Sequence, residues 1–476
     1  MLKGGKFMDE QQNMEKRPTN PRRKKRTKFQ IFKEVYLPVI IAGIALIFIL
    51  TFIIGSIVRA VQNNNLQAQL AQEESIAQQQ KAEAQAMEAE DLLSRASLLA
   101  AQCDYDRAIE VINSFSGNLT EHANLAEALE QYENAKASLV LWNDPNQVLN
   151  LSFQPLIADS QRAFSDSTYG TSYNRNYVTT GEFRKILQQL YENGYILVRL
   201  SDITTENGPK DLYLPNGKKP LILTETHVNY NTYMIDGDGD KLPDKDGDGF
   251  ASKLILDDNG NLACSMVNAQ GETVTGEYDL VPILESFIET HPGFSYRGAR
   301  AILALTGYDG VFGYRTSPAA EEFFGVAFHD SEVAAAQEIV AALQSRGYEF
   351  ACYSYENEPY GQFTAGQIQA ELAKWQTEVT PILGEPDIFV FCRNSDIAPN
   401  GSAYSDDKFQ AIQALGFKYY LGFCENGTPI YSAHNGYIRQ GRILVTGSNM
   451  AHQKAWFDGI FDPDAVLESA RGAIPN

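Results

Sequence analysis

Residues 332–354 read EVAAAQEIVAALQSRGYEFACYS, and this stretch decides the fold class of the chain. Residues 332–346 are mostly good helix formers, and Gly347 is the residue type that most often ends a helix. Residues 348–354 have mostly aromatic and small side chains, which are typical of a buried strand. The stretch therefore predicts a helix that leads directly into a strand.

The same alternation of strands and helices continues on both sides of this stretch. It predicts βα units and a parallel sheet. So many consecutive units favour a closed barrel; a doubly wound open sheet is the alternative, although no G-x-G-x-x-G follows a strand. We expect further strands at residues 150–157, 195–200, 220–228, 301–306, 387–392, 418–424 and 442–446, and further helices at residues 181–194, 280–290, 364–383 and 406–415.

An acidic insertion, MIDGDGDKLPDKDGDGF, occupies residues 234–250. Aspartates alternate with glycines, as in loops that fold hard oxygen ligands around calcium. The insertion resembles thrombospondin type 3 and dockerin-like loops, but Ile255 stands where a complete EF-hand has glutamate. We expect a structural calcium site, and a solvated acidic loop is the alternative. The expected ligands are Asp236, Asp238, Asp240, Asp244, Asp246 and Asp248.

An uncharged apolar segment, YLPVIIAGIALIFILTFIIGSIV, covers residues 36–58. As a helix it would be roughly 34 Å long, and the hydrocarbon core of a bilayer is about 30 Å thick. Residues 1–35 are rich in lysine and arginine, so the positive-inside rule places them in the cytoplasm and the C-terminal part outside the cell. A cleavable signal peptide is the rival interpretation, but the apolar run is longer than such peptides require.

The region after the apolar segment consists of good helix formers. Residues 59–91 predict a helical stalk, and a weak heptad there leaves a homodimeric coiled coil possible. Helical patterns at residues 92–115 and 124–142 predict a small all-α hairpin spacer, residues 92–145. Residues 148–476 form the expected barrel domain.

Composition narrows the possible partners. The formal net charge of −21 argues against nucleic acid as a partner. Five cysteines are too few for a disulfide scaffold. Cys352, Cys392 and Cys424 lie at strand ends, and they are open to three interpretations: a metal site with His227, a disulfide, or simple burial.

Three segments carry a resemblance to a known family: residues 178–203, residues 219–224 (KPLILT) and residues 347–351 (GYEFA). They resemble the polysaccharide deacetylase (NodB-homology) family over about residues 148–450. The resemblance implies a distorted (β/α)7 barrel. It also implies a zinc-like metal that serves to remove acetyl groups from N-acetylated sugars of envelope glycans.

The catalytic positions of that family carry other residues here. Thr226 and His227 stand where the family has an aspartate base and an aspartate ligand, and Tyr353 and Asn357 stand where it has histidine ligands. Arg393 stands at the arginine of a further family motif, and the other residues of that motif are absent here. Threonine is no base near neutral pH, and asparagine and tyrosine are poor zinc ligands. We therefore expect a pseudoenzyme that keeps the barrel but not the deacetylase mechanism.

These observations predict a membrane-anchored extracytoplasmic protein that binds or scaffolds cell-envelope glycan. An active carbohydrate deacetylase with altered site residues and a protein-interaction module are the alternatives. Aromatic side chains in strand-end loops are expected to stack on sugar rings. The candidates are Tyr230, Tyr233, Tyr353, Tyr355 and Tyr360.

Overall fold

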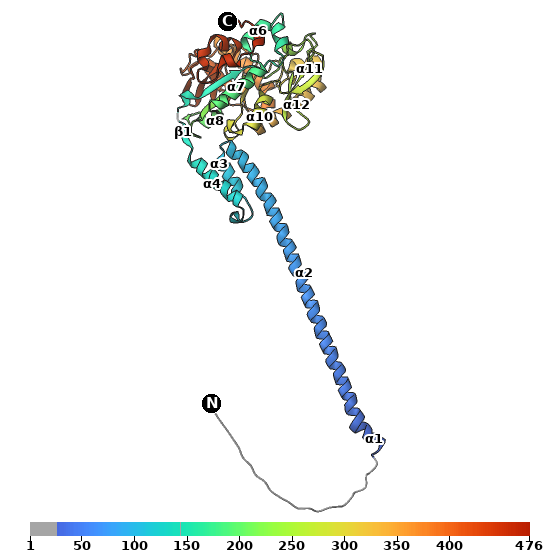
Figure 1. Ribbon diagram of the computed structural model, residues 1–476. Coiled ribbons are helices and arrows are strands. Elements are labelled where there is room, and N and C mark those ends of the chain that lie inside the picture. The colour runs from blue at the N-terminus through green and yellow to red at the C-terminus, as the bar shows by residue number, and fades with distance from the viewer. Residues whose placement is uncertain (1–25, 143) are drawn as a thin grey trace, which may run out of the picture. The chain divides into compact units, whose positions relative to one another are not determined.

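The computed structural model describes residues 26–142 and 144–476 (Figure 1). The chain divides into two compact units, Met1–Ala86 and Met87–Asn476. Most of the basic tail expected at residues 1–35 lies outside the described residues.

A single helix makes up the described part of the first unit and continues into the second. It runs from Lys28 to Ala101 through α1 (Lys28–Ile31), η1 (Phe32–Tyr36) and α2 (Leu37–Ala101). Within the described residues it is the one helix long and apolar enough to cross a membrane, with a mean hydropathy of 3.0 in its most apolar window. The predicted apolar anchor helix is thus present, and the stalk is the same helix without a break. The orientation stays a prediction.

The second unit begins with the helical spacer. The last turns of α2, α3 (Tyr105–Asn113) and α4 (Ala123–Ala137) share a small core. The helix predicted at residues 92–115 is interrupted, because Cys103 adopts a φ of 60° and turns the chain between α2 and α3. The helix predicted at residues 124–142 ends early, and its last residues form the short strand β1 (Val140–Trp142) on β6 (Leu212–Leu214).

Seven parallel strands close into a barrel, which confirms the closed architecture and excludes the open sheet. The strand β7 completes the ring, since it pairs with β2 through Glu225 and with β11 through Thr226. The strands are, in order, β2 (Leu149–Phe153), β7 (Lys219–Thr226), β11 (Ile302–Leu305), β12 (Glu349–Cys352), β13 (Ile388–Val390), β14 (Tyr419–Phe423) and β16 (Tyr437–Leu444).

Helices between the strands cover the barrel, and their ends follow the capping rules. Thr179 accepts a hydrogen bond from the backbone N–H of Glu182 at the start of α7, and Gly347 ends α12 with a φ of 99°. These helices bury apolar side chains against the outer face of the strands. The main ones are α7 (Thr180–Glu192), α10 (Leu280–Thr290), α12 (Val326–Arg346), α13 (Ala365–Glu378), α15 (Asp407–Gln413), α16 (Gly447–His452) and α17 (Pro463–Val466).

Several strands differ from the expectation. The last barrel strand begins at Tyr437, before the predicted residues 442–446, and β15 (Tyr431–His434) pairs with it antiparallel. The strand predicted at residues 195–200 is β3 (Tyr195–Leu197), which pairs with β7 beside the ring. A separate antiparallel sheet follows the acidic insertion and was not predicted. It consists of β8 (Lys253–Leu256), β9 (Leu262–Val267) and β10 (Thr273–Gly276).

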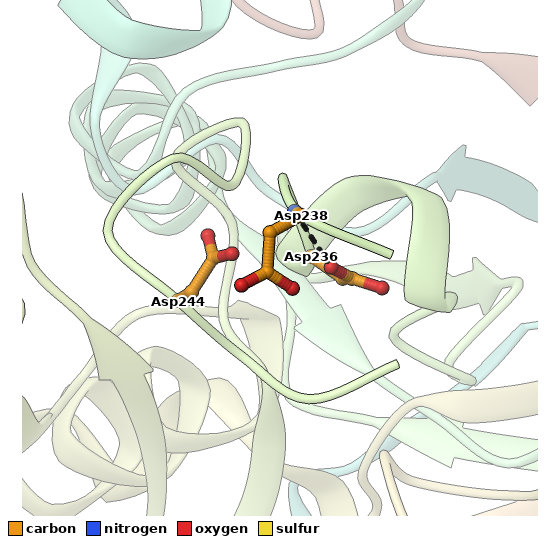
Figure 2. A group of neighbouring side chains, drawn as sticks. All are labelled: Asp236, Asp238 and Asp244. Atoms are coloured by element: carbon orange, nitrogen blue, oxygen red, sulfur yellow. Dashed lines mark hydrogen bonds between the residues drawn. The ribbon is translucent and has the colours of Figure 1, made fainter. Parts of the chain in front are cut away.

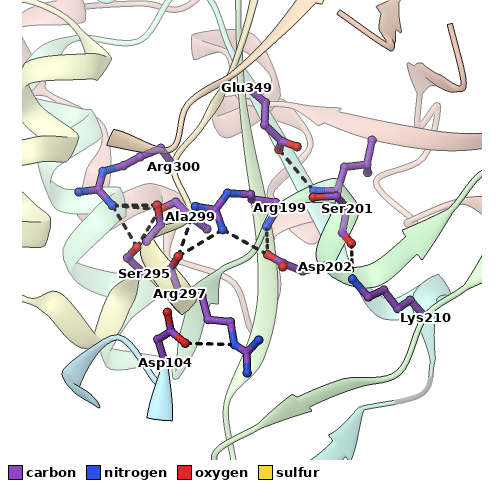
Figure 3. A network of polar contacts seen from close by, with 12 residues as sticks. Asp104, Arg199, Ser201, Asp202, Lys210, Ser295, Arg297, Ala299, Arg300 and Glu349 are labelled. Atoms are coloured by element: carbon purple, nitrogen blue, oxygen red, sulfur yellow. Dashed lines mark hydrogen bonds and ion pairs between the residues drawn. The ribbon is translucent and has the colours of Figure 1, made fainter. Parts of the chain in front are cut away.

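A polar network joins the spacer to the amino-terminal end of the barrel (Figure 3). Arg297 binds the carboxylate of Asp106 at 2.6 Å and lies 3.9 Å from that of Asp104. Its backbone carbonyl accepts hydrogen bonds from the Arg199 guanidinium at 3.2 and 3.3 Å. The network holds the spacer at the end of the barrel opposite to the carboxyl ends of the strands.

Candidate functional site

The carboxyl ends of the barrel strands carry the predicted site residues, and we call this region the barrel mouth: Thr226, His227, Tyr353, Cys392 and Arg393. The rings of His227 and Tyr353 meet edge to face, with centroids 5.4 Å apart. His227 and Arg393 have φ values of 65° and 50°. Residues held in this region of the backbone are strained, and such strain is concentrated at functional sites.

His227 is neutral near neutral pH. Burial lowers the pKa of its imidazole to about 4, the nearby guanidinium of Arg393 acts in the same direction, and Asp309 opposes both. Asp309 is itself engaged, because one of its oxygens accepts hydrogen bonds from the backbone N–H and the hydroxyl of Thr232, at 2.9 and 3.1 Å. The mouth therefore presents a neutral imidazole beside a cation.

Alternation along β7 decides which of its side chains reach the barrel interior. Leu221 and Leu223 face the outer helices, whereas Ile222 packs inside the barrel. Thr224, of the same parity as Ile222, donates its hydroxyl to the buried amide oxygen of Asn150 at 2.8 Å. Successive side chains of a strand point to opposite faces, so Thr226 belongs to the interior.

Glu225 consequently points away from the mouth. It lies buried against Asp279, the residue that caps α10, and neither carboxylate oxygen of Glu225 has a hydrogen-bond partner. Burial and the neighbouring Asp279 raise the pKa of Glu225 well above its usual range. Thr226 instead donates its hydroxyl to the carbonyl of Phe153 at 3.2 Å. Thus neither residue supplies a carboxylate base at the mouth.

The donor set of the mouth does not fit a catalytic zinc-like metal. His227 is the one good ligand among the four motif positions, and the cation Arg393 stands beside it. Asn357 lies in the loop after β12, half-buried, with its side-chain oxygen lacking a hydrogen-bond partner. Across residues 26–142 and 144–476, three or more acidic, histidine or cysteine ligand atoms converge within 4.8 Å only in the acidic insertion.

A line of tyrosine rings in contact runs inward from the protein surface, and its inner end lies near enough to Tyr353 of the mouth to feel its charge. Tyr169 and Tyr233 are 40% and 43% exposed, and their ring centroids lie 5.3 Å apart. Tyr173 continues the line at 5.8 Å from Tyr169, and Tyr177 follows at 5.4 Å from Tyr173. Burial raises the pKa of Tyr177 well above its usual range, and nearby Tyr233 and Tyr353 add to the effect. We call Tyr169, Tyr173, Tyr177, Tyr233 and Tyr353 the tyrosine track.

The track corrects the expectation about stacking residues. Of the five predicted tyrosines, only Tyr233 is exposed. Tyr230, Tyr353, Tyr355 and Tyr360 are buried, so in this structure Tyr233 alone of the five presents a ring face to a sugar. Tyr169 was missed, because it precedes α6 (Gly170–Asn176), far from any strand end in the sequence.

Three aspartates of the acidic insertion converge, as Figure 2 shows. Carboxylate oxygens of Asp236, Asp238 and Asp244 lie within 4.8 Å of one another. Backbone N–H groups fix them: Asp236 accepts from Gly239 at 2.7 Å, and Asp244 accepts from Asp246 at 2.8 Å. The oxygen type and spacing suit calcium.

The other three predicted calcium ligands are engaged elsewhere in the loop. Asp240 accepts a hydrogen bond from the backbone N–H of Leu242, and Asp246 pairs with Lys245 at 2.7 Å. Asp248 accepts a hydrogen bond from the Tyr173 hydroxyl and so ties the insertion to the tyrosine track. The structure therefore groups three of the six residues and separates the rest.

The cysteines at the strand ends form no disulfide. All five cysteines of the chain are free and buried. Cys392 lies inside the barrel, and its thiol donates to the carbonyl of Tyr353 at 3.0 Å. Burial raises the pKa of Cys392 to about 12. It is therefore a neutral buried thiol, which favours the simplest of the three interpretations.

Comparisons with known proteins give little beyond this geometry. No family model matches the sequence, and no curated protein matches it. Among solved structures, the chain is similar to the deacetylase PplD of Streptococcus pyogenes in complex with acetate. The sequence identity is 14%, the match covers 66% of this chain and 95% of that chain, and the TM-score is 0.35. At this level the similarity carries no inference about the site.

Proposed function

We propose that this protein is anchored in the cell membrane, faces the extracytoplasmic side, and binds an envelope glycan at the barrel mouth without hydrolysing it. The observation that carries the proposal is the tyrosine track, at a mouth whose side chains do not form a metal-ligand set. The track ends at the contact between Tyr353 and His227. The exposed rings of Tyr169 and Tyr233, at the outer end of the track, can bind the apolar faces of sugars and offer hydroxyls for hydrogen bonds.

The absence of a base at the mouth supports binding over catalysis. Amide hydrolysis needs a group that takes a proton from water and a group that protonates the leaving amine. The Thr226 hydroxyl cannot take the first role, and the Glu225 carboxyl lies on the outer side of the strand. A neutral His227 beside Arg393 would support hydrogen bonding to a ligand rather than metal binding.

Substitution of Tyr233 tests the binding proposal. Binding of an N-acetylated chitooligosaccharide to the full-length protein in nanodiscs, measured by titration calorimetry, should weaken about three- to tenfold in Tyr233→Ala and in Tyr169→Ala. Tyr213 is a matched control, because it is 46% exposed but lies on β6, away from the track. Equal affinities for wild type and Tyr233→Ala would refute the assignment, and so would equal losses in Tyr213→Ala.

A second proposed property is calcium binding by the acidic insertion. The convergence of Asp236, Asp238 and Asp244 supports it. A bound cation would relieve the mutual repulsion of these carboxylates and hold the insertion in place. Because Asp248 bonds to Tyr173, calcium would also steady one wall of the tyrosine track.

A further inference from the structure

Arg442 is a buried cation whose neighbours differ from those of the other buried arginines. In the described part of the barrel unit, each of the others faces a carboxylate, as expected for charges removed from water. Arg300 pairs with Glu285, Arg439 with Asp396 and Arg471 with Glu182. The Arg315 guanidinium bonds to two backbone carbonyls, but the charges of the nearby carboxylates of Asp309 and Glu332 act on it.

The guanidinium of Arg442 is only partly satisfied. Its side chain is fully buried in the barrel. One terminal nitrogen donates to the hydroxyl of Ser152 at 2.8 Å and the other to the carbonyl of Phe391 at 3.0 Å, while Nε has no partner. The guanidinium also lies 4.5 Å from the ring centroid of Phe423. None of these contacts cancels its charge.

The titratable groups around Arg442 are neutral. Among the described residues, those whose charge acts on it are Tyr353, Cys392 and Cys424. Burial raises the pKa of each cysteine thiol to about 12, and it raises the pKa of Tyr353 further still. A buried charge without a counter-charge is costly to the folded state, so this arrangement points to a functional site.

A second cation lies close by at the surface. Arg393 follows the strand end whose Phe391 carbonyl accepts from Arg442. Both guanidinium groups act on Tyr353 and Cys392, and each opposes the rise that burial causes in their pKa values. Arg393 is exposed, whereas Arg442 lies within the barrel, and the charges of both act on Tyr353.

We propose that the barrel mouth binds an anionic group of the glycan, a carboxylate or a phosphate, at Arg393 with the positive charge of Arg442 beneath it. This inference rests on the proposed function and gives it a substrate class, acidic glycans. Guanidinium groups bind both oxyanions through charge-assisted hydrogen bonds. Tyr353, on which the charges of both arginines act, has a hydroxyl that can donate a further hydrogen bond to the anion.

Small probes test the anion site apart from the glycan. Full-length protein in nanodiscs of neutral lipid is titrated with glucuronate, with glycerol phosphate and with glucose. We expect at least one anion to bind and glucose not to bind, with an affinity that falls about tenfold or more in Arg393→Gln. Preference for glucuronate identifies a carboxylate source, and preference for glycerol phosphate identifies a phosphate source. Arg346→Gln is the control, because Arg346 bonds to the Gly260 carbonyl, far from the mouth.

Arg442→Gln should produce a similar loss, and exposed Arg393 keeps the test decisive if the Arg442 variant does not fold. Anions that bind no better than glucose, or equally well in Arg393→Gln, would overturn the inference. If the neutral chitooligosaccharide still binds through Tyr233 in that case, the proposed glycan function stands alone. If anions bind through Arg393 and no oligosaccharide binds, the anion site stands and the glycan assignment falls.

Discussion

At the scale of residues, Glu225 and Thr226 are neighbours in β7 that face opposite sides of the barrel wall. The strand period of two turns the carboxyl of Glu225 toward Asp279 and the hydroxyl of Thr226 toward the interior. The Glu225 carboxyl, one position before the expected base, therefore cannot act as a base at the mouth. The same geometry brings His227 next to Tyr353 and Arg393.

The charge state of His227 is a residue-scale prediction. The pKa of about 4 means that the folded protein keeps this imidazole neutral at pH values where an unfolded histidine, near 6.5, is protonated. Its contribution to stability is therefore complete above about pH 6.5 and is lost as the pH falls toward 4. Histidine NMR of the full-length protein should show no titration of His227 between pH 5.5 and 8.

Arg393→Gln provides the internal check on that titration. Removing the guanidinium should raise the pKa of His227, since Arg393 acts in the same direction as burial. Arg346→Gln should leave it unchanged. An imidazole that titrates near pH 6.5 in wild type would show that the mouth is open to water and that Arg393 lies elsewhere.

At the scale of elements, the acidic insertion and the tyrosine track are joined through the bond from Tyr173 to Asp248. The insertion sits between α9 (Thr232–Ile235) and β8, on the segment that follows β7. Calcium would thus act on a wall of the mouth from outside the barrel. The three aspartates that converge each close a turn onto a backbone N–H group, which holds their carboxylates in place.

Calcium titration of the insertion is the element-scale prediction. Chelator-treated full-length protein should bind calcium with a Kd of about 10⁻⁴–10⁻³ M, the range of extracellular sites. Asp238→Asn should abolish binding, because asparagine keeps an acceptor oxygen for the turn but loses the charge. Asp246→Asn should have little effect, since Asp246 pairs with Lys245. Calorimetry with no heat at millimolar calcium, or equal losses in both variants, would reject the site.

Elements with a strong local signal could be predicted from the sequence. The helix expected at residues 280–290 has those bounds in the structure, and Gly347 ends α12 as its residue type predicts. The start of β16 was missed because Arg439, Gln440 and Arg442 make a buried strand look polar. The tyrosine track could not be predicted, since tertiary packing brings its members together.

At the scale of the whole molecule, the chain combines a helix able to span a membrane with a closed parallel barrel. The spacer is fixed to the amino-terminal end of the barrel through Arg297, so the carboxyl ends of the strands remain free for a ligand. We propose that the anchor keeps this mouth close to the envelope glycan. On this account the protein recognises an acidic polymer and does not modify it.

Release of acetate tests the central claim most directly. Full-length protein in nanodiscs is incubated with an N-acetylated chitooligosaccharide and added zinc or cobalt, and free acetate is measured over time. The account predicts no release above that of the same mixture without protein, because the mouth has neither a base nor a metal-ligand set. Robust turnover that disappears in Thr226→Val or His227→Ala would contradict it.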